Sequence, residues 1–311
     1  MLFSRRNFLT GMAAVGACGL TAHAADGAAT DPCLSVFLSD PHQSGWRGGK
    51  QPTHMNAVFA KEIDRILAMC PLPARAVLFG DIALWKGRHD DYAMARKSLD
   101  RLTEAGIAVF VTTGNHDHRD VMFRYFPRQK ELTPVPGRLV SVIDLGTCDL
   151  LLLDSLDENP QGEGFSNNVG GALDDAQWEW LQKEAPARKR PFLVGAHHAI
   201  NDLGGRKARA LLGPLDKFVG WIHGHDHTWS KETNLRRRNS RALFRTAVLP
   251  GSGYWGDIGH ATMRTYADRA VLTLHQSDFY YPDPPRDGER RPPDYDAVVA
   301  ENDGQTCTFF Y

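Results

Sequence analysis

Five short clusters of aspartate, asparagine and histidine stand along the chain, and each follows an apolar run. Taken singly, each has an ordinary structural explanation, since Gly-Asp is a common turn and paired histidines are often half-buried and hydrogen-bonded. Together they offer carboxylate, amide and imidazole ligands, a mixture that suits Fe, Mn, Zn or Co better than calcium or a thiolate zinc site. The clusters are Asp40-Pro41-His42, Gly80-Asp81, Gly114-Asn115-His116-Asp117, His197-His198 and Gly224-His225-Asp226-His227.

Two clusters place their candidate ligands two residues apart, Asp40 with His42 and His225 with His227. In an extended backbone, residues i and i+2 point to the same side, so each pair can reach a shared ion. A carboxylate has two oxygens and can bridge two ions. The spacing therefore predicts that each pair can contribute to a transition-metal site.

The apolar runs before the clusters predict the elements that position them. Strands are expected at 34–39, 76–79 and 107–111, separated by helices at 54–69 and 91–105. This alternation indicates β-α-β units with parallel strands, whose carboxyl ends form one ligand-binding edge. Further strands are expected at 150–154, 192–196 and 218–222, with a helix near 174–183. Beyond residue 230 the pattern is strand-rich (243–249, 262–266, 270–274) and predicts a second, mixed or antiparallel sheet in one domain.

The five clusters, in this order, resemble the motifs of the calcineurin-like metallophosphoesterases over residues 34 to 230. The resemblance implies an α/β fold, a four-layer α-β-β-α sandwich of two mixed β-sheets flanked by helices. It also implies two metal sites that share Asp81 as the bridging ligand. The first ion would be held by Asp40, His42, Asp81 and His227, and the second by Asp81, Asn115, His197 and His225. His197 is our choice in the fourth cluster, and His198 stays open as the alternative.

The resemblance implies hydrolysis of a phosphate ester by metal-activated hydroxide. His116 corresponds to the family's non-ligand histidine, which we expect to protonate the leaving group or to steady the phosphoryl charge. Asp117 would orient His116, and its alternative role is that of a turn carboxylate. Leu84 stands where purple acid phosphatases carry their iron-binding tyrosine.

G-N-H-D, rather than G-N-H-E, resembles the class III cyclic-nucleotide and glycerophosphodiester phosphodiesterases, which predicts a small phosphodiester as substrate. The alternatives are a phosphomonoesterase, a nuclease or phospholipid diesterase, and a non-catalytic metal-binding protein. The formal net charge of -1 predicts no nucleic-acid partner. Trp85, Tyr254 and Trp255 stand in expected loops and can either stack on a nucleobase or pack against the protein.

The N-terminus resembles a twin-arginine signal peptide over residues 1–24. Arg5-Arg6 precede an apolar run and the A-x-A site Ala22-His23-Ala24, so we expect twin-arginine translocation to the periplasm or secretion. Lipidation at Cys18 is the alternative, and no later segment predicts a membrane span. The remaining organisation is a linker at 25–33, the phosphoesterase domain at 34–281 and a proline-rich extension at 282–311. The aromatic run 279–281 predicts either cover for the core or a homodimer contact.

Overall fold

The computed structural model describes residues 30–46, 54–158, 168–236, 243–280 and 295–311. The expected signal peptide, with Cys18, and the proline-rich stretch 282–294 lie outside these residues. No helix in the described ranges is long and apolar enough to cross a membrane. The four cysteines in these ranges, Cys33, Cys70, Cys148 and Cys307, are unpaired thiols.

The first sheet has six strands in the order β12-β11-β10-β1-β2-β3. Its β1, β2 and β3 run parallel, whereas β10 pairs antiparallel with β1 and continues into the antiparallel β11 and β12. The strands are β1 (Thr30–Leu38), β2 (Leu72–Leu78), β3 (Ala108–Val111), β10 (Gly256–Thr265), β11 (Arg269–Tyr280) and β12 (Thr306–Phe310).

The second sheet also has six strands, in the order β4-β5-β6-β7-β9-β8. The four central strands are parallel, and both edge strands are antiparallel to their neighbours. The strands are β4 (Ser141–Asp144), β5 (Asp149–Leu152), β6 (Phe192–Ala196), β7 (Phe218–His223), β8 (Ser230–Arg236) and β9 (Leu243–Val248).

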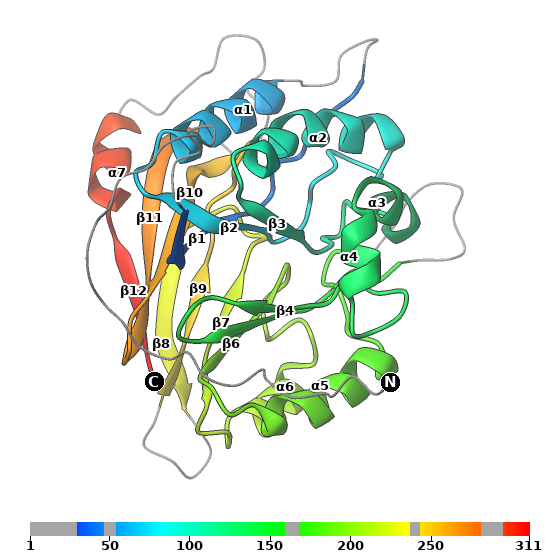
Figure 1. Ribbon diagram of the computed structural model, residues 1–311, viewed down its shortest axis with the longest axis vertical. Helices are drawn as coiled ribbons and strands as arrows, with labels where there is room; N and C mark the ends of the chain where they lie inside the picture. The colour runs from blue at the N-terminus through cyan, green and yellow to red at the C-terminus, as the bar shows by residue number, and fades with distance from the viewer. Residues whose placement is uncertain (1–29, 47–53, 159–167, 237–242, 281–294) are drawn as a thin grey trace, which may run out of the picture.

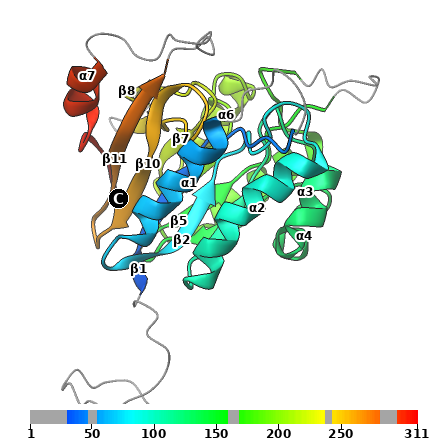
Figure 2. The same cartoon turned by 90° about the horizontal axis from the view of Figure 1, so that it is seen from above.

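Helices cover the outer faces of both sheets (Figures 1 and 2). Helices α1 (His54–Leu67) and α2 (His89–Glu104) pack on the first sheet, and α5 (Asp175–Ala187) and α6 (Gly205–Leu212) pack on the second. In α1 the apolar side chains recur every three or four residues, which gives one buried face. The expected four-layer α-β-β-α sandwich is therefore confirmed. The shorter helices are α3 (Arg119–Tyr125), α4 (Pro127–Leu132) and α7 (Tyr295–Asn302).

The central core lies between the two sheets, and β1 shows how one strand serves two layers. Phe37 points into the space between the sheets, while its neighbours Val36 and Leu38 point to the helix layer. A strand buried on both faces must be apolar at every position, which explains the continuous apolar runs in the sequence.

Three expectations about organisation need correction. The strands beyond residue 230 do not form a sheet of their own, because β8 and β9 join the second sheet whereas β10 and β11 join the first. The domain also does not end at residue 281, since β12 closes the edge of the first sheet and Phe309 is buried in the central core. Likewise β1 begins at Thr30, inside the expected linker. The strand β12 has only five residues. A pattern this short in the sequence does not distinguish an edge strand from an unstructured tail.

Candidate metal centre

The seven predicted ligands all follow the carboxyl ends of parallel strands. Asp40 and His42 follow β1, Asp81 follows β2 and Asn115 follows β3. The second sheet supplies His197 after β6, and His225 and His227 after β7. The site therefore lies where the carboxyl ends of both sheets meet, and the structure brings together all seven side chains.

The backbone at five of these ligands is left-handed. Positive φ values occur at Asp40 (53°), His42 (42°), Asp81 (49°), His225 (69°) and His227 (52°), and at no other non-glycine residue in the described ranges. A left-handed non-glycine residue is uncommon and costs on the order of 1–3 kcal/mol, and such residues cluster at functional sites. The paired ligands thus converge through strained turns, which corrects the extended geometry expected from their spacing.

Backbone hydrogen bonds between the motifs hold these turns. The amide of Asp40 donates to the carbonyl of Gly80 (3.1 Å), and the amide of His42 donates to that of Asp81 (3.0 Å). Two glycines allow the loops to approach so closely. A Cβ atom on Gly114 would overlap the carboxylate of Asp81, and one on Gly224 would overlap the hydroxyl of Ser39. Both glycines therefore stand where any larger residue would displace a ligand.

The first group of ligand atoms joins Asp40, His42 and His227, all buried. Nε2 of His227 lies 3.1 Å from Oδ1 of Asp40 and 3.3 Å from Nε2 of His42. The other nitrogen of each ring, Nδ1, faces a backbone carbonyl. Nδ1 of His227 lies 3.1 Å from the carbonyl oxygen of Trp255, and Nδ1 of His42 lies 3.4 Å from that of Leu84. These carbonyls assign the ring hydrogen to Nδ1, so both Nε2 atoms present lone pairs. Oδ1 of Asp40 is buried without a hydrogen-bond donor.

The second group is centred on Nε2 of His197. This atom lies 3.3 Å from Oδ2 of Asp81, 3.2 Å from Oδ1 of Asn115 and 3.2 Å from Nδ1 of His225. Nδ1 of His197 donates to the carbonyl of Phe79 at 2.7 Å, so Nε2 presents its lone pair to the site once the ring is neutral. In both groups, then, acceptor atoms converge on one another. A cation between them removes the repulsion, so the donor set fits the two transition-metal ions that the sequence predicts.

Asp81 takes part in both groups. Its Oδ2 lies 3.3 Å from Nε2 of His197 and 3.7 Å from Nε2 of His42. The carboxylate is buried at the point where the groups meet. This position suits the bridging role that the family resemblance implies.

His198 stands apart from His197 in its contacts. Its Nδ1 lies 2.8 Å from the hydroxyl of Ser155, although the ring also comes within 4.8 Å of the ligand nitrogens of His197 and His225. His197 is the histidine of this pair whose nitrogen meets Asp81 and Asn115. The geometry thus favours His197 as the ligand.

The electrostatics of the buried site favour charged carboxylates. Burial by itself would raise the pKa of Asp40, but His227 and His197 outweigh it and hold the pKa well below its ordinary value. Burial would likewise raise the pKa of Asp81, but His197 and His116 outweigh it and lower that pKa well below its ordinary value. Burial, reinforced by His116, lowers the pKa of His42 to about 3, so this ring is neutral as a ligand must be. Burial would also lower the pKa of His197, but Asp81 and Asp40 raise it to about 9.

His116 lies beside the ligands with part of its ring open to solvent. Its Nδ1 donates to the carbonyl of Leu84 at 2.8 Å, and its Nε2 lies 4.0 Å from Oδ2 of Asp81. The side chain is 27 % exposed, against 2 % for Asp81, so Nε2 can meet a molecule that enters the site. This is the position that a proton donor to a leaving group requires.

Of the two roles expected for Asp117, its contacts favour the turn carboxylate over the partner that orients His116. Its carboxylate accepts hydrogen bonds from the amides of Ile82 (3.2 Å), Ala83 (3.1 Å) and Gly114 (2.9 Å), and from the hydroxyl of Tyr92 (3.0 Å). These bonds tie the loop of Asp81 to the loop of Asn115, whereas the carbonyl of Leu84 orients the ring of His116. Burial and the nearby Asp81 raise the pKa of Asp117 to about 6. Asp117 is therefore a positioning residue for the metal loops.

Three residues orient ligand rings although no sequence motif predicts this role for them: Phe79, Leu84 and Trp255. Each acts through its backbone carbonyl, which no side-chain motif records. Trp255 also stacks on His227, with ring centroids 4.2 Å apart and planes at 5°. Only its place in an expected loop near the last motif pointed to it.

Comparisons with known proteins concern the family and the fold. A family model described as calcineurin-like phosphoesterase matches residues 35–229. No curated protein sequence gives a match. Among solved structures, the chain is similar to a dimetal phosphatase from Danio rerio, with 15% identity, a TM-score of 0.58, and 79% of this chain and 97% of that chain covered.

Two further solved structures share the fold. PhoD is 10% identical with a TM-score of 0.57, and the match covers 92% of this chain and 71% of that one. The purple acid phosphatase PPD1 from yellow lupin (Lupinus luteus) seeds is 12% identical with a TM-score of 0.56, and the match covers 88% and 53% of the two chains. At these identities the likeness concerns the fold alone.

Proposed function

Because the chain belongs to the calcineurin-like phosphoesterase family and is a metal-dependent phosphoester hydrolase, we propose that its preferred substrates are small phosphodiesters. The observation that carries the reaction class is the convergence of buried acceptor atoms on Asp40, Asp81 and His197. When bound, two ions would lower the pKa of a coordinated water and neutralise charge on the phosphoryl oxygens.

The chain's own residues have separate tasks in this reaction. Asp40, His42 and His227 would hold one ion and Asn115, His197 and His225 the other, with Asp81 between them. His116 would act as the imidazolium, passing the Nε2 proton to the oxygen of the departing alcohol while its Nδ1 hydrogen stays on the carbonyl of Leu84. Asp117 would hold the loop of Asp81 and the loop of Asn115 in place relative to each other.

The charges around the site support a diester. Arg119, three residues after His116, is buried and forms ion pairs with Asp154 (2.8 Å) and Glu158 (2.9 Å). Its guanidinium is therefore engaged by these two carboxylates and is not directed at a substrate phosphate. A diester brings one negative charge to such a site, whereas a monoester brings up to two. The G-N-H-D motif, Gly114 to Asp117, points to the same substrate class.

The direct test is hydrolysis by chelated protein to which Mn, Fe, Zn or Co is returned. We expect bis(p-nitrophenyl) phosphate to be cleaved faster than p-nitrophenyl phosphate, and only after an ion is restored. Asp81→Asn should lose bound ions and activity, while Asp226→Asn should keep both, because Asp226 is exposed beside the ligands. Faster cleavage of the monoester would overturn the diester preference, and two bound ions without any hydrolysis would favour a non-catalytic metal protein.

We also propose export by the twin-arginine machinery, which rests on Arg5-Arg6 and the A-x-A site in the sequence. Replacing both arginines by lysine should keep the activity in the cytoplasmic fraction. Equal periplasmic activity with and without the arginine pair would contradict this route.

A further inference from the structure

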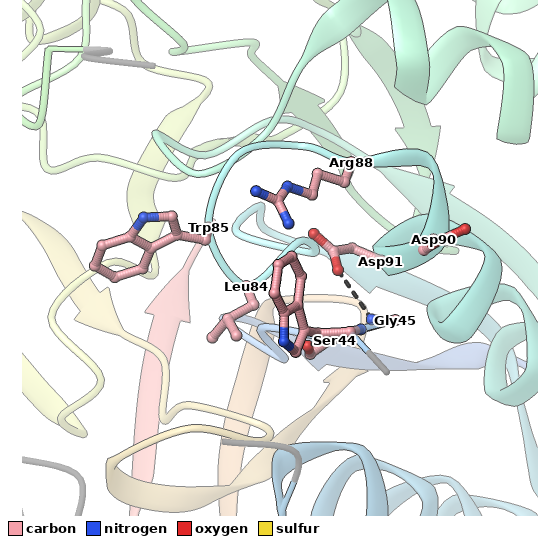
Figure 3. Close-up of a pocket in the computed structure, with 8 residues that line it drawn as sticks. Ser44, Gly45, Leu84, Trp85, Arg88, Asp90 and Asp91 are labelled. Atoms are coloured by element: carbon pink, nitrogen blue, oxygen red, sulfur yellow. Dashed lines mark hydrogen bonds between the residues drawn. The ribbon is translucent and has the colours of Figure 1, made fainter. Parts of the chain in front are cut away.

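A cavity of about 240 Å³ lies between the segment that follows the first metal motif and the loop before α2 (Figure 3). Its lining includes Ser44, Trp46, Leu84, Trp85, Arg88 and Asp91. Most of these residues belong to the loop that runs from Leu84 into the start of α2, and the others follow the first metal motif. Asp91 joins the two segments by accepting the amide hydrogen of Gly45 at 2.9 Å, so this wall of the cavity is preformed.

Two residues that line the cavity, Leu84 and Trp85, also contact the proton donor of the proposed reaction. The indole of Trp85 meets the ring of His116 edge-on, with centroids 5.7 Å apart and planes at 70°. The carbonyl of the preceding residue, Leu84, accepts the Nδ1 hydrogen of His116. A group attached to the oxygen that His116 protonates must therefore lie next to Trp85.

The walls of the cavity favour a flat ring. Trp85 is 57% exposed and Trp46 is 44% exposed, although large apolar side chains are normally covered. The guanidinium of Arg88 lies 4.8 Å from the centroid of the Trp46 ring, which adds a second planar surface. Pockets for drug-sized ligands measure roughly 300–1,000 Å³, so this smaller space suits one ring system and not an extended chain.

We propose that this cavity receives the leaving group and that Trp85 selects phosphodiesters whose leaving alcohol carries an aromatic or heteroaromatic ring. The inference rests on the proposed function for which side of the substrate leaves. The preference for a ring rests on the cavity alone. Trp85 is then a specificity-determining residue, while Trp46 and Arg88 line another part of the same cavity. Stacking on one aromatic side chain changes affinity by about tenfold.

The test measures binding, so that it does not depend on turnover. Protein loaded with manganese is titrated calorimetrically with benzylphosphonate and with methylphosphonate, which cannot be hydrolysed at their P–C bonds. We expect the wild type to bind benzylphosphonate about tenfold more tightly. Trp85→Leu should remove this preference without changing the affinity for methylphosphonate, and Trp85→Phe should restore most of it.

Tyr266→Leu is the matched control, since Tyr266 is another exposed aromatic residue (39%) and lies in the turn between β10 and β11. Equal affinities of the wild type for the two phosphonates, or no binding of either, would overturn the subsite. So would an equal loss of both in Trp85→Leu, because Trp85 would then only order His116. A protein that shows the ring preference but cleaves no ester would keep the subsite and refute the proposed function.

Discussion

The Nε2 atoms of His42 and His227 lie 3.3 Å apart, and neither ring has a hydrogen to place between them. Each ring directs its Nδ1 to a backbone carbonyl, that of Leu84 or that of Trp255, so two lone pairs face each other in a buried space. Burying such atoms without a partner is costly, and a shared cation is the simplest compensation. This pair of residues links the sequence motifs to the metal chemistry of the family.

Removing the proton donor should separate catalysis from metal binding. His116→Ala is expected to reduce kcat for bis(p-nitrophenyl) phosphate by about 10²–10⁴, the usual contribution of a general acid. Both ions should stay bound, because the ring of His116 contacts the carbonyl of Leu84 and stands outside the converging ligand atoms of His197.

The control for this change is His118→Ala, which removes a half-exposed histidine two residues away. Metal content by elemental analysis and steady-state kinetics are measured on both variants. A His116→Ala protein with unchanged kcat would refute the assignment of the acid.

The two adjacent histidines should behave differently on substitution. His197→Ala is expected to lose an ion, because it removes the nitrogen that meets Asp81 and Asn115. His198→Ala should retain two ions and lose only thermal stability, since the ring of His198 forms a hydrogen bond with the hydroxyl of Ser155. Metal stoichiometry after dialysis decides between them, and loss of an ion from His198→Ala alone would reverse the ligand assignment.

Metal binding should release protons and strengthen as the pH rises. In the metal-free site the pKa of His197 stands at about 9, because Asp81 and Asp40 outweigh the opposing effect of burial. At pH 7 the ring is thus protonated and must lose that proton to bind an ion. We expect the affinity for Mn to rise about tenfold per pH unit between pH 6 and pH 8, measured by competition with a chelator. A constant affinity over this range would contradict the protonated state.

The same raised pKa affects the stability of the metal-free protein. The ionic contacts of His197 stabilise the fold fully below its ordinary value of 6.5 and are lost as the pH rises through about 9. The melting temperature of the metal-free protein should therefore fall from pH 7 to pH 10. His197→Gln, which has no titrating group, should lack this component of the decrease.

The stacked tryptophan should influence one ion through its ligand ring. Trp255→Leu removes the ring that lies parallel to His227 at 4.2 Å but leaves the backbone carbonyl that binds Nδ1. Changes in groups that orient a ligand typically lower metal affinity about 10–100-fold, and we expect the lower end of that range. Retention of Mn against a chelator is the measurement. Trp85→Leu is the control, because Trp85 borders His116, which we assign as the proton donor and not as a ligand, and equal losses in both variants would refute the specific role of Trp255.

Local pattern was enough to predict the order of the strands that carry the motifs and the types of the ligands. Apolar runs that end in Asp40, Asp81 or Asn115 indicate buried strands, and a strand's carboxyl end is set by the chain direction. The edge strand β12 was not predicted, because it lies 26 residues beyond its partner β11, which ends at Tyr280. Its place in the sheet depends on a pairing that no local signal records.

By itself, the sequence determined which ligand types are present and in what order, and the family resemblance of its motifs implied a sandwich of two sheets. The tertiary structure decided how those ligands are presented. His197 is oriented by the carbonyl of Phe79, which is 118 positions away, and its partner Asn115 is 82 positions away. The left-handed turns at Asp40 and His42 likewise depend on hydrogen bonds to the next strand. Tautomer, backbone strain and the choice between His197 and His198 come from contacts distant in sequence, and only the folded chain brings those atoms within range of one another.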